Sequence, residues 1–261
     1  MTLHYDSEGD GPLVVLLHGF PEFRRAWRNQ LPALARAGFR AVAPDLRGYG
    51  ESPKPRGVEQ YELPLIVGDV AELIESLGGG PCVLVGHDWG AMTAWFVAMM
   101  RPDLVRKLVI LNVPHPAAFS RELRRSGEQK RRVAYQAFFQ LPVLPELLMR
   151  AFGRRFLRRL GPFTSEQLDE YQRAWRGSLT TMLHYYRALR RSRGRLRPLM
   201  RRIDVPVLLI WGTREPVFVK ETLENVGEWV PELRVEKIEG AGHFVQHEAA
   251  GRVNELLLQF L

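Results

Sequence analysis

The chain has 261 residues, of which 46% are hydrophobic and 25% are charged, and its formal net charge is +8. This composition is ordinary for a soluble globular protein, and the length is enough to bury one large core. No apolar run approaches the roughly 20 residues that a membrane-spanning helix needs. The single cysteine, Cys82, excludes an internal disulfide and suits a reducing compartment, so we expect a cytoplasmic protein.

The positive charge is concentrated in one part of the chain. From Pro114 to Asp204 there are 21 Lys and Arg residues against 7 Asp and Glu residues, a local balance of +14. Arginine-rich faces occur on solvated helices and also on surfaces that meet nucleic acid, anionic lipid or acidic partners. Because no nucleic-acid motif accompanies the charge, we expect a solvated helical surface and no nucleic-acid partner. A weak contact of this basic segment with an anionic surface stays open.

Short apolar runs bounded by turn residues alternate with amphipathic segments along most of the chain. Buried strands are predicted at 12–20, 39–45, 81–88, 105–113 and 205–212, with a weaker one at 232–243. Helices are predicted at 27–38 (closed by Gly38), at 63–77, at 91–100 and at 220–229. This alternation predicts an α/β fold with a mostly parallel sheet that helices cover on both faces.

The alternation stops between His115 and about Arg202, where the sequence is predicted to be wholly helical. This segment follows one predicted strand and precedes another, and the two strands should be neighbours in the sheet. We therefore divide the chain into a first core part at 1–113, a helical cap at 114–202 and a second core part at 203–261.

The segment "GHDWGA", at 86–91, joins a predicted strand to a predicted helix. Gly86 and Gly90 allow the backbone to turn sharply around Asp88, which predicts a nucleophile elbow with a carboxylate at its apex. The N-terminus of the following helix favours negative charge at this place. The alternative is that Asp88 serves only as the N-cap of the helix.

Three further positions supply what such a nucleophile needs. The loop "HGFPE" can direct the Phe20 N–H and the Trp89 N–H toward one point, which predicts a two-donor oxyanion hole. His243, in "GAGHFVQHE", comes last in the chain, in the order nucleophile, acid, histidine that this hydrolase layout has. Glu215 lies just beyond a strand end, 28 residues before His243, and is the carboxylate expected to orient the imidazole.

These motifs together resemble the α/β-hydrolase fold and, more narrowly, the soluble epoxide hydrolase family. The resemblance covers nearly the whole chain and includes "PDLRGYGESPKP" at 44–55, "NVPHP" at 112–116 and "AGHFVQHE" at 241–248. It implies a helical cap after "NVPHP", with two tyrosines that face the nucleophile. Their contexts resemble "YQAFFQ" and "LHYYR" here, which assigns them to Tyr135 and Tyr186, with Tyr185 as the competitor for the second role.

The resemblance implies an epoxide hydrolase that converts an epoxide and water into a vicinal diol. Asp88 would form an alkyl ester with the epoxide carbon, while the two tyrosines polarise and protonate the epoxide oxygen. Water activated by the His243 and Glu215 pair would then hydrolyse the ester. The implied substrate pocket includes Phe20, Trp89, Gln136 and Phe139. The implied partners are a small epoxide and water, and no cofactor or metal is implied.

Some positions depart from the family pattern and keep alternatives open. The family usually has aspartate where Glu215 stands, and Asn112 holds the other possible acid position and cannot serve as an acid. A haloalkane or haloacid dehalogenase would use the same aspartate, but Phe20 stands where an asparagine donor for halide is expected. A noncatalytic binding protein on the same fold is the third hypothesis. Substrate identity, enantiopreference and the choice between monomer and homodimer are not set by the sequence.

Other histidines invite assignments that we do not favour. His243, His247 and Glu248 have a spacing that suggests metal ligation, but the "HExxH" order is absent. His18 and His87 flank the elbow and the "HGFPE" loop, and we expect both to be buried turn residues that hydrogen-bond to the backbone.

Overall fold

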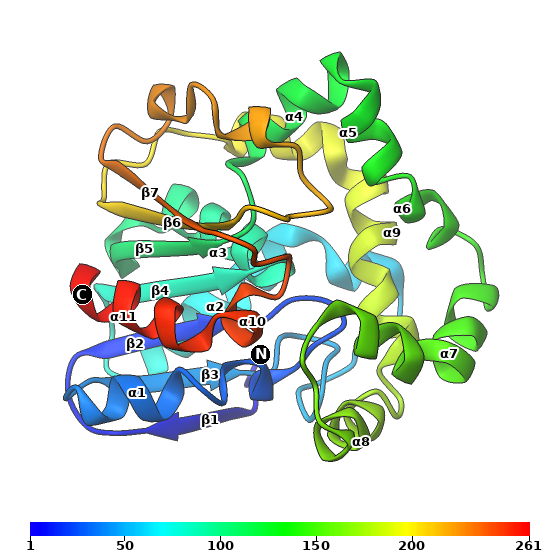
Figure 1. Cartoon of the computed structure of the whole chain (residues 1–261), viewed down its shortest axis with the longest axis horizontal. Helices are drawn as coiled ribbons and strands as arrows, with labels where there is room; N and C mark the ends of the chain where they lie inside the picture. The colour runs from blue at the N-terminus through cyan, green and yellow to red at the C-terminus, as the bar shows by residue number, and fades with distance from the viewer.

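The computed structural model describes the backbone of residues 1–261 and every side chain except those at 159, 160 and 193. One seven-stranded sheet has the order β1-β3-β2-β4-β5-β6-β7 (Figure 1). The strands are β1 (Tyr5–Glu8), β2 (Leu13–Leu17), β3 (Arg40–Pro44), β4 (Cys82–His87), β5 (Val105–Leu111), β6 (Val207–Gly212) and β7 (Leu233–Ile238). Strand β1 is antiparallel to β3, and the other pairs are parallel, so the α/β prediction is confirmed.

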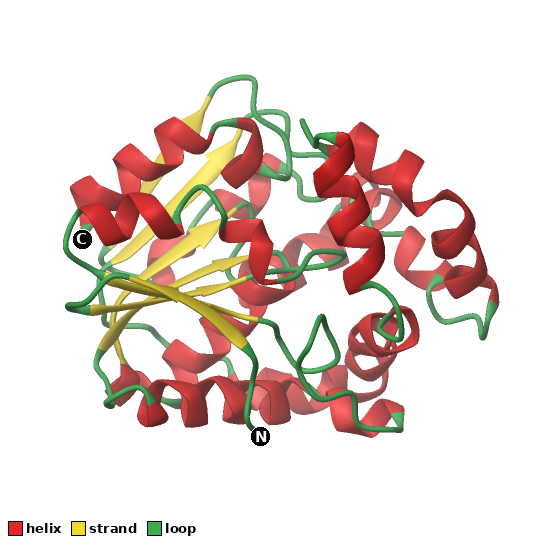
Figure 2. Ribbon diagram, turned by 90° about the horizontal axis from the view of Figure 1, so that it is seen from below, coloured by secondary structure: helices red, strands yellow, loops and turns green.

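Helices cover both faces of the sheet, which is why its central strands β2, β4 and β6 are apolar and buried (Figure 2). Helices α2 (Leu63–Ser76) and α3 (Trp89–Met100) pack on one face, against Val15 and Leu17 of β2. Helices α1 (Leu31–Arg36) and α11 (Ala250–Phe260) pack on the other, against Val14 and Leu16. Alternate residues of one strand thus belong to two separate cores.

A layer of helices lies beyond the carboxyl ends of the parallel strands (Figure 1). Its helices are α4 (Pro116–Arg125), α5 (Gly127–Arg132), α6 (Tyr135–Phe138), α7 (Leu144–Leu160), α8 (Ser165–Ala174) and α9 (Leu179–Leu196). The layer is inserted between β5 and β6, which pair directly, as expected. The proposed cap limits, 114 and 202, fall in the segments that connect these helices to the sheet.

Short helical turns complete the chain. They are the 3-10 helices Arg24–Trp27, Val58–Tyr61, Pro102–Leu104, Arg197–Leu199, Lys220–Leu223 and Val226–Glu228, and the helix α10 (Val245–Glu248). No helix in the part of the chain that the structure describes is long and apolar enough to cross a membrane.

Two predicted helices differ from the structure, and one strand was not predicted. The prediction of one helix at 220–229 is wrong. Asn225 adopts a left-handed conformation (φ 56°) that separates two 3-10 helices. The helix expected at 27–38 is confined to Leu31–Arg36 and is preceded by a 3-10 turn. Strand β1 was not predicted, since its side chains are mostly exposed and show no apolar run.

Candidate active site

The elbow after β4 holds Asp88 in a strained backbone conformation. Its φ of 49° and ψ of −118° lie outside the regions that L residues usually adopt. The flanking glycines are needed for close packing: a Cβ on Gly90 would collide with the Leu17 carbonyl, and a Cβ on Gly86 would collide with the Ala91 backbone. The Asp88 side chain makes no capping hydrogen bond to α3, so the alternative of a simple N-cap is wrong.

The loop after β2 supplies a backbone donor to this carboxylate. The Phe20 N–H donates to Asp88 Oδ1 at 2.6 Å. Gly19 permits the approach, because a Cβ there would collide with the Asp88 side chain. Trp89, the second predicted donor, is the first residue of α3, and among the described contacts its N–H makes no hydrogen bond to the carboxylate. The structure therefore brings one of the two predicted donors to Asp88.

Strands β2 and β4 place these two segments side by side. In the strand order, β3 lies next to β2 in one direction and β5 lies next to β4 in the opposite direction. The loops after β2 and β4 thus diverge at the carboxyl edge, which is where parallel α/β sheets form ligand crevices.

A buried histidine bridges two carboxylates. His243 Nδ1 lies 2.6 Å from Glu215 Oε2, and His243 Nε2 lies 3.6 Å from Asp88 Oδ2. The second oxygen of Glu215 accepts the N–H groups of Val217 at 2.5 Å and Phe218 at 3.3 Å. These bonds fix the glutamate side chain in place with its other oxygen on the imidazole.

Asn112, at the end of β5, holds the histidine loop rather than acting as an acid. Its Oδ1 accepts the Gly212 N–H at 2.7 Å, and its Nδ2 donates to the carbonyls of Gly242 at 2.8 Å and His243 at 2.7 Å. The side chain thereby joins β6 to the loop that carries the histidine.

The charges in this cluster shift the pKa values of its members. Burial lowers the pKa of His243, but the charges of Glu215 and Asp88 outweigh burial and raise that pKa to about 10. Burial alone would raise the pKa of Asp88, yet His243, His87 and the Phe20 N–H bring it below its usual value. The raised pKa favours the protonated form of the imidazole that lies between Glu215 and Asp88.

The cap places two tyrosines over this cluster. The ring of Tyr186, on α9, packs against Phe20 at 5.3 Å and Trp89 at 5.1 Å, and the ring of Tyr135, on α6, lies 6.3 Å from that of Tyr186. Burial raises the pKa of both phenols, and the negative charge of Asp88 raises them further. The pKa of each hydroxyl therefore depends on the charge of Asp88.

Tyr185 is engaged elsewhere. Its hydroxyl is buried and donates to the Arg47 carbonyl at 2.7 Å, and its ring packs against Tyr49. The same turn of α9 thus directs Tyr186 toward the aromatic cluster and Tyr185 toward the core loop after β3.

A cavity of about 1250 Å³, larger than a typical small-molecule pocket, opens beside Tyr186, but its lining does not include Asp88 or the predicted pocket residues Phe20 and Trp89. Tyr186 and Gln136 line it together with the apolar side chains of Met92, Phe96 and Leu189. Phe139, the other cap residue expected in the pocket, packs against the ring of Tyr186 at 4.9 Å. The side chain of Asp88 keeps 15% of its surface exposed.

A buried carboxylate in the "HGFPE" loop was not assigned a role from the sequence. Glu22 accepts the hydroxyl of Tyr171 at 2.7 Å and the amide of Gln246 at 2.9 Å, and it lies 2.7 Å from His247 Nε2 and 3.3 Å from His87 Nδ1. Burial alone would raise its pKa, but the two histidines lower it below its usual value. The sequence offers one signal for Glu22, namely a carboxylate that follows a proline shortly after a buried strand. Glu22 ties the cap helix α8 to the core beside the elbow.

His18 and His87 are buried and contact backbone groups, as expected. His18 Nε2 accepts the Leu46 N–H at 3.0 Å, and His87 Nε2 lies 2.8 Å from the His243 carbonyl. His247 pairs with Glu22 rather than with a metal-binding group. Within the described side chains, no group of three or more His, Cys, Asp or Glu residues is placed to hold a metal ion.

Comparisons with known proteins agree with this geometry. The model of the alpha/beta hydrolase fold family matches residues 12–250. The AB hydrolase superfamily protein YfhM of Bacillus subtilis (strain 168) is 36% identical over 272 residues, which span 100% of this chain and 94% of that protein. Epoxide hydrolase 4 of Mus musculus is 33% identical over 279 residues, which span 100% of this chain and 76% of that protein.

A solved structure shows the same likeness in three dimensions. A mutant epoxide hydrolase from Bacillus megaterium, crystallised with its naphthyloxy-propane-diol product, superposes with a TM-score of 0.92 at 37% identity. The match spans 99% of this chain and 96% of that one. The chain therefore belongs to the α/β-hydrolase fold and, within it, to the epoxide hydrolase family of hydrolases.

Proposed function

We propose that this protein hydrolyses epoxides to vicinal diols through a covalent ester on Asp88. The observation that carries the proposal is that the two carboxylate oxygens of Asp88 have different partners. Oδ1 is held by the Phe20 N–H, whereas Oδ2 faces His243 Nε2. An epoxide offers a strained sp³ carbon rather than a carbonyl, and a carboxylate is a suitable nucleophile for such a carbon.

Ring opening is the first step. Oδ2 of Asp88 attacks an epoxide carbon, the ring C–O bond breaks, and the oxygen takes a proton from Tyr135 or Tyr186. The Oδ1 oxygen becomes the ester carbonyl oxygen, already bonded to Phe20. The epoxide would approach the part of the Asp88 side chain that stays exposed.

Ester formation removes the negative charge of Asp88 and thereby lowers the pKa values of His243 and the two tyrosines. Asp88 is one of the two carboxylates that raise the pKa of His243 to about 10, so that pKa falls when the ester forms. The same charge raises the pKa of both tyrosines, so they become better acids as the ring opens. The imidazolium proton then passes through solvent to the tyrosinate and leaves His243 as a base.

Hydrolysis completes the cycle. His243, oriented by Glu215, takes a proton from water, and the hydroxide adds to Cγ of Asp88. The Phe20 N–H and the Trp89 N–H stabilise the oxyanion on Oδ1, and in other enzymes one such donor contributes about 3 kcal/mol. The Cγ–Oδ2 bond then breaks, the diol oxygen takes the proton of the new carboxyl group, and His243 is again an imidazolium beside two carboxylates.

A product assay tests the proposal against both alternatives. The purified protein and its Asp88→Ala variant are incubated with styrene oxide and, separately, with a haloalkane of similar size. We expect diol from the epoxide with the unmodified chain, and none above background with the variant. Halide release without diol would make the protein a dehalogenase. The absence of both diol and halide would favour a noncatalytic binding protein.

A further inference from the structure

Helix α7 exposes an apolar face that the catalytic site does not use. Large hydrophobic side chains between 141 and 156 have exposed fractions from 40% to 62%. They are Leu141, Val143, Leu144, Leu147, Leu148, Phe152 and Phe156, and we call them the α7 apolar face. The positions within the helix follow the three- and four-residue spacing of a single helix side. Exposed large apolar side chains gathered on one side of a helix are typical of an interaction site.

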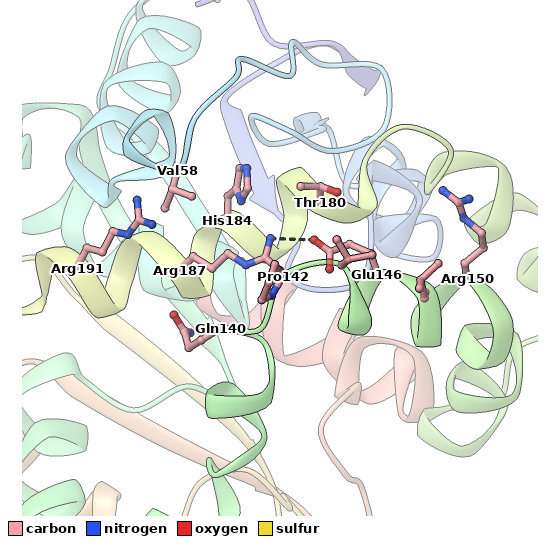
Figure 3. Close-up of a pocket in the computed structure, with 11 residues that line it drawn as sticks. Val58, Gln140, Pro142, Glu146, Arg150, Thr180, His184, Arg187 and Arg191 are labelled. Atoms are coloured by element: carbon pink, nitrogen blue, oxygen red, sulfur yellow. Dashed lines mark hydrogen bonds and ion pairs between the residues drawn. The ribbon is translucent and has the colours of Figure 1, made fainter.

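The opposite side of α7 is the one that packs on the protein. Leu157 is completely buried, and a Cβ on Gly153 would collide with the ring of Trp175. The only acidic residue of the helix, Glu146, forms an ion pair with Arg187 at 2.8 Å (Figure 3). The α7 apolar face therefore points away from the cap, and α7 lies at the edge of the molecule farthest from the sheet (Figure 1).

Arginines accompany this face. Arg150, Arg155 and Arg158 are exposed on α7, and none of them has a carboxylate within ion-pair distance among the described side chains. A cavity of about 520 Å³ opens beside the first turns of the helix. Arg150 and Arg191 line it together with Leu147, so positive charge extends from α7 to α9 at this edge (Figure 3).

We propose that the α7 apolar face docks on a membrane surface that contains anionic lipids. The apolar side chains would enter the boundary between headgroups and acyl chains, and the arginines would meet the lipid phosphates. A second copy of the chain fits less well, because a symmetric contact would bring unpaired arginines of both copies together without an acidic side chain on the face. The contact is peripheral and does not depend on the reaction proposed for Asp88.

Vesicle co-sedimentation of the full chain tests the proposal. Vesicles of phosphatidylcholine with phosphatidylglycerol are compared with vesicles of phosphatidylcholine alone. We expect binding to the anionic vesicles, weaker binding at high salt, and little binding to the neutral ones. The double variant Arg155→Gln and Arg158→Gln should bind about 30-fold more weakly, at roughly fivefold for each arginine. The double variant Leu148→Ser and Phe152→Ser should lose binding at every salt concentration.

Matched changes elsewhere provide the controls. Leu65→Ser with Leu258→Ser removes two apolar side chains, 43% and 40% exposed, from the core part, and Arg56→Gln removes an exposed arginine there. These controls should bind like the unmodified chain, and thermal melting should show that every variant is folded. Equal binding by all variants, or no binding to anionic vesicles, would overturn the proposal. So would a dimer that the α7 variants convert to a monomer in the absence of any vesicle binding.

Discussion

Asp88 Oδ2 lies 3.6 Å from His243 Nε2, while the other oxygen of the same carboxylate is held at 2.6 Å by the Phe20 N–H. The two oxygens are thus distinguished before any substrate binds. In the proposed mechanism, the oxygen held by Phe20 becomes the ester carbonyl oxygen, and the oxygen that faces His243 forms the new bond to carbon. Glu215 contacts the other nitrogen of the imidazole. Because Asp88 also raises the pKa of His243, a change in the charge of Asp88 acts directly on the imidazole.

Replacing the cap tyrosines tests how the epoxide oxygen is held. Tyr135→Phe and Tyr186→Phe should each slow ring opening by about 100-fold, and the double variant should nearly abolish it, since general acid catalysis is then lost. Rapid-quench measurement of ester formation isolates this step. Tyr185→Phe is the control: its hydroxyl serves the Arg47 carbonyl, so stability should fall by about 1 kcal/mol while ring opening stays near normal. A loss for Tyr185→Phe as large as for Tyr186→Phe would reverse the assignment.

Replacing the base should trap the intermediate. His243→Gln leaves Asp88 able to attack but removes the group that activates water. Mass spectrometry of the variant after exposure to styrene oxide should therefore show the full mass of the substrate added to the peptide that contains Asp88. An unmodified peptide together with slow diol release would point to direct attack of water on the epoxide.

The Glu215 side chain should be needed for orientation and charge together. Glu215→Gln keeps the size but removes the charge beside His243 and favours the wrong tautomer, so turnover should fall by about 10⁴-fold. Glu215→Asp keeps the charge but is too short to hold both His243 and the Val217 N–H, so its loss should be smaller. Steady-state rates on one epoxide compare the two variants. Similar activity for Glu215→Gln and the unmodified chain would remove Glu215 from the mechanism.

The charge of His243 predicts a pH dependence of stability. Its folded-state pKa of about 10 lies above the unfolded value of about 6.5. The resulting stabilisation is fully present below about pH 6.5 and is lost as the pH rises through about 10. Melting temperatures of the unmodified chain should thus decline over this range more steeply than those of His243→Gln. Parallel curves would mean that the imidazole is neutral in the resting enzyme.

Much of the fold follows from local sequence patterns. The apolar runs that became β2 to β6 are buried on both faces, so their signal is strong, and the glycines around Asp88 mark a turn that tolerates no Cβ. Strand β1 lacks that signal because it is an exposed edge strand. At 220–229 the left-handed Asn225 interrupts a segment whose composition favours a helix.

The arrangement of the cap was less accessible from sequence. Tyr185 and Tyr186 are adjacent, and only the packing of α9 decides which of them meets Phe20. Glu22 becomes central because residues from α8, α10 and the end of β4 converge on it. The apolar spacing of α7 indicates an amphipathic helix, but tertiary packing turned that face to solvent rather than to the core.

A single turnover in heavy-oxygen water, with the enzyme in excess over epoxide, tests the covalent role of Asp88 most directly. In the proposed mechanism the diol leaves with the original Oδ2 of the carboxylate, and water replaces that oxygen in the protein. We therefore predict an unlabelled diol from this first turnover and one heavy oxygen in the peptide that contains Asp88. A labelled diol with an unlabelled peptide would show that water attacks the epoxide itself, and it would contradict the account.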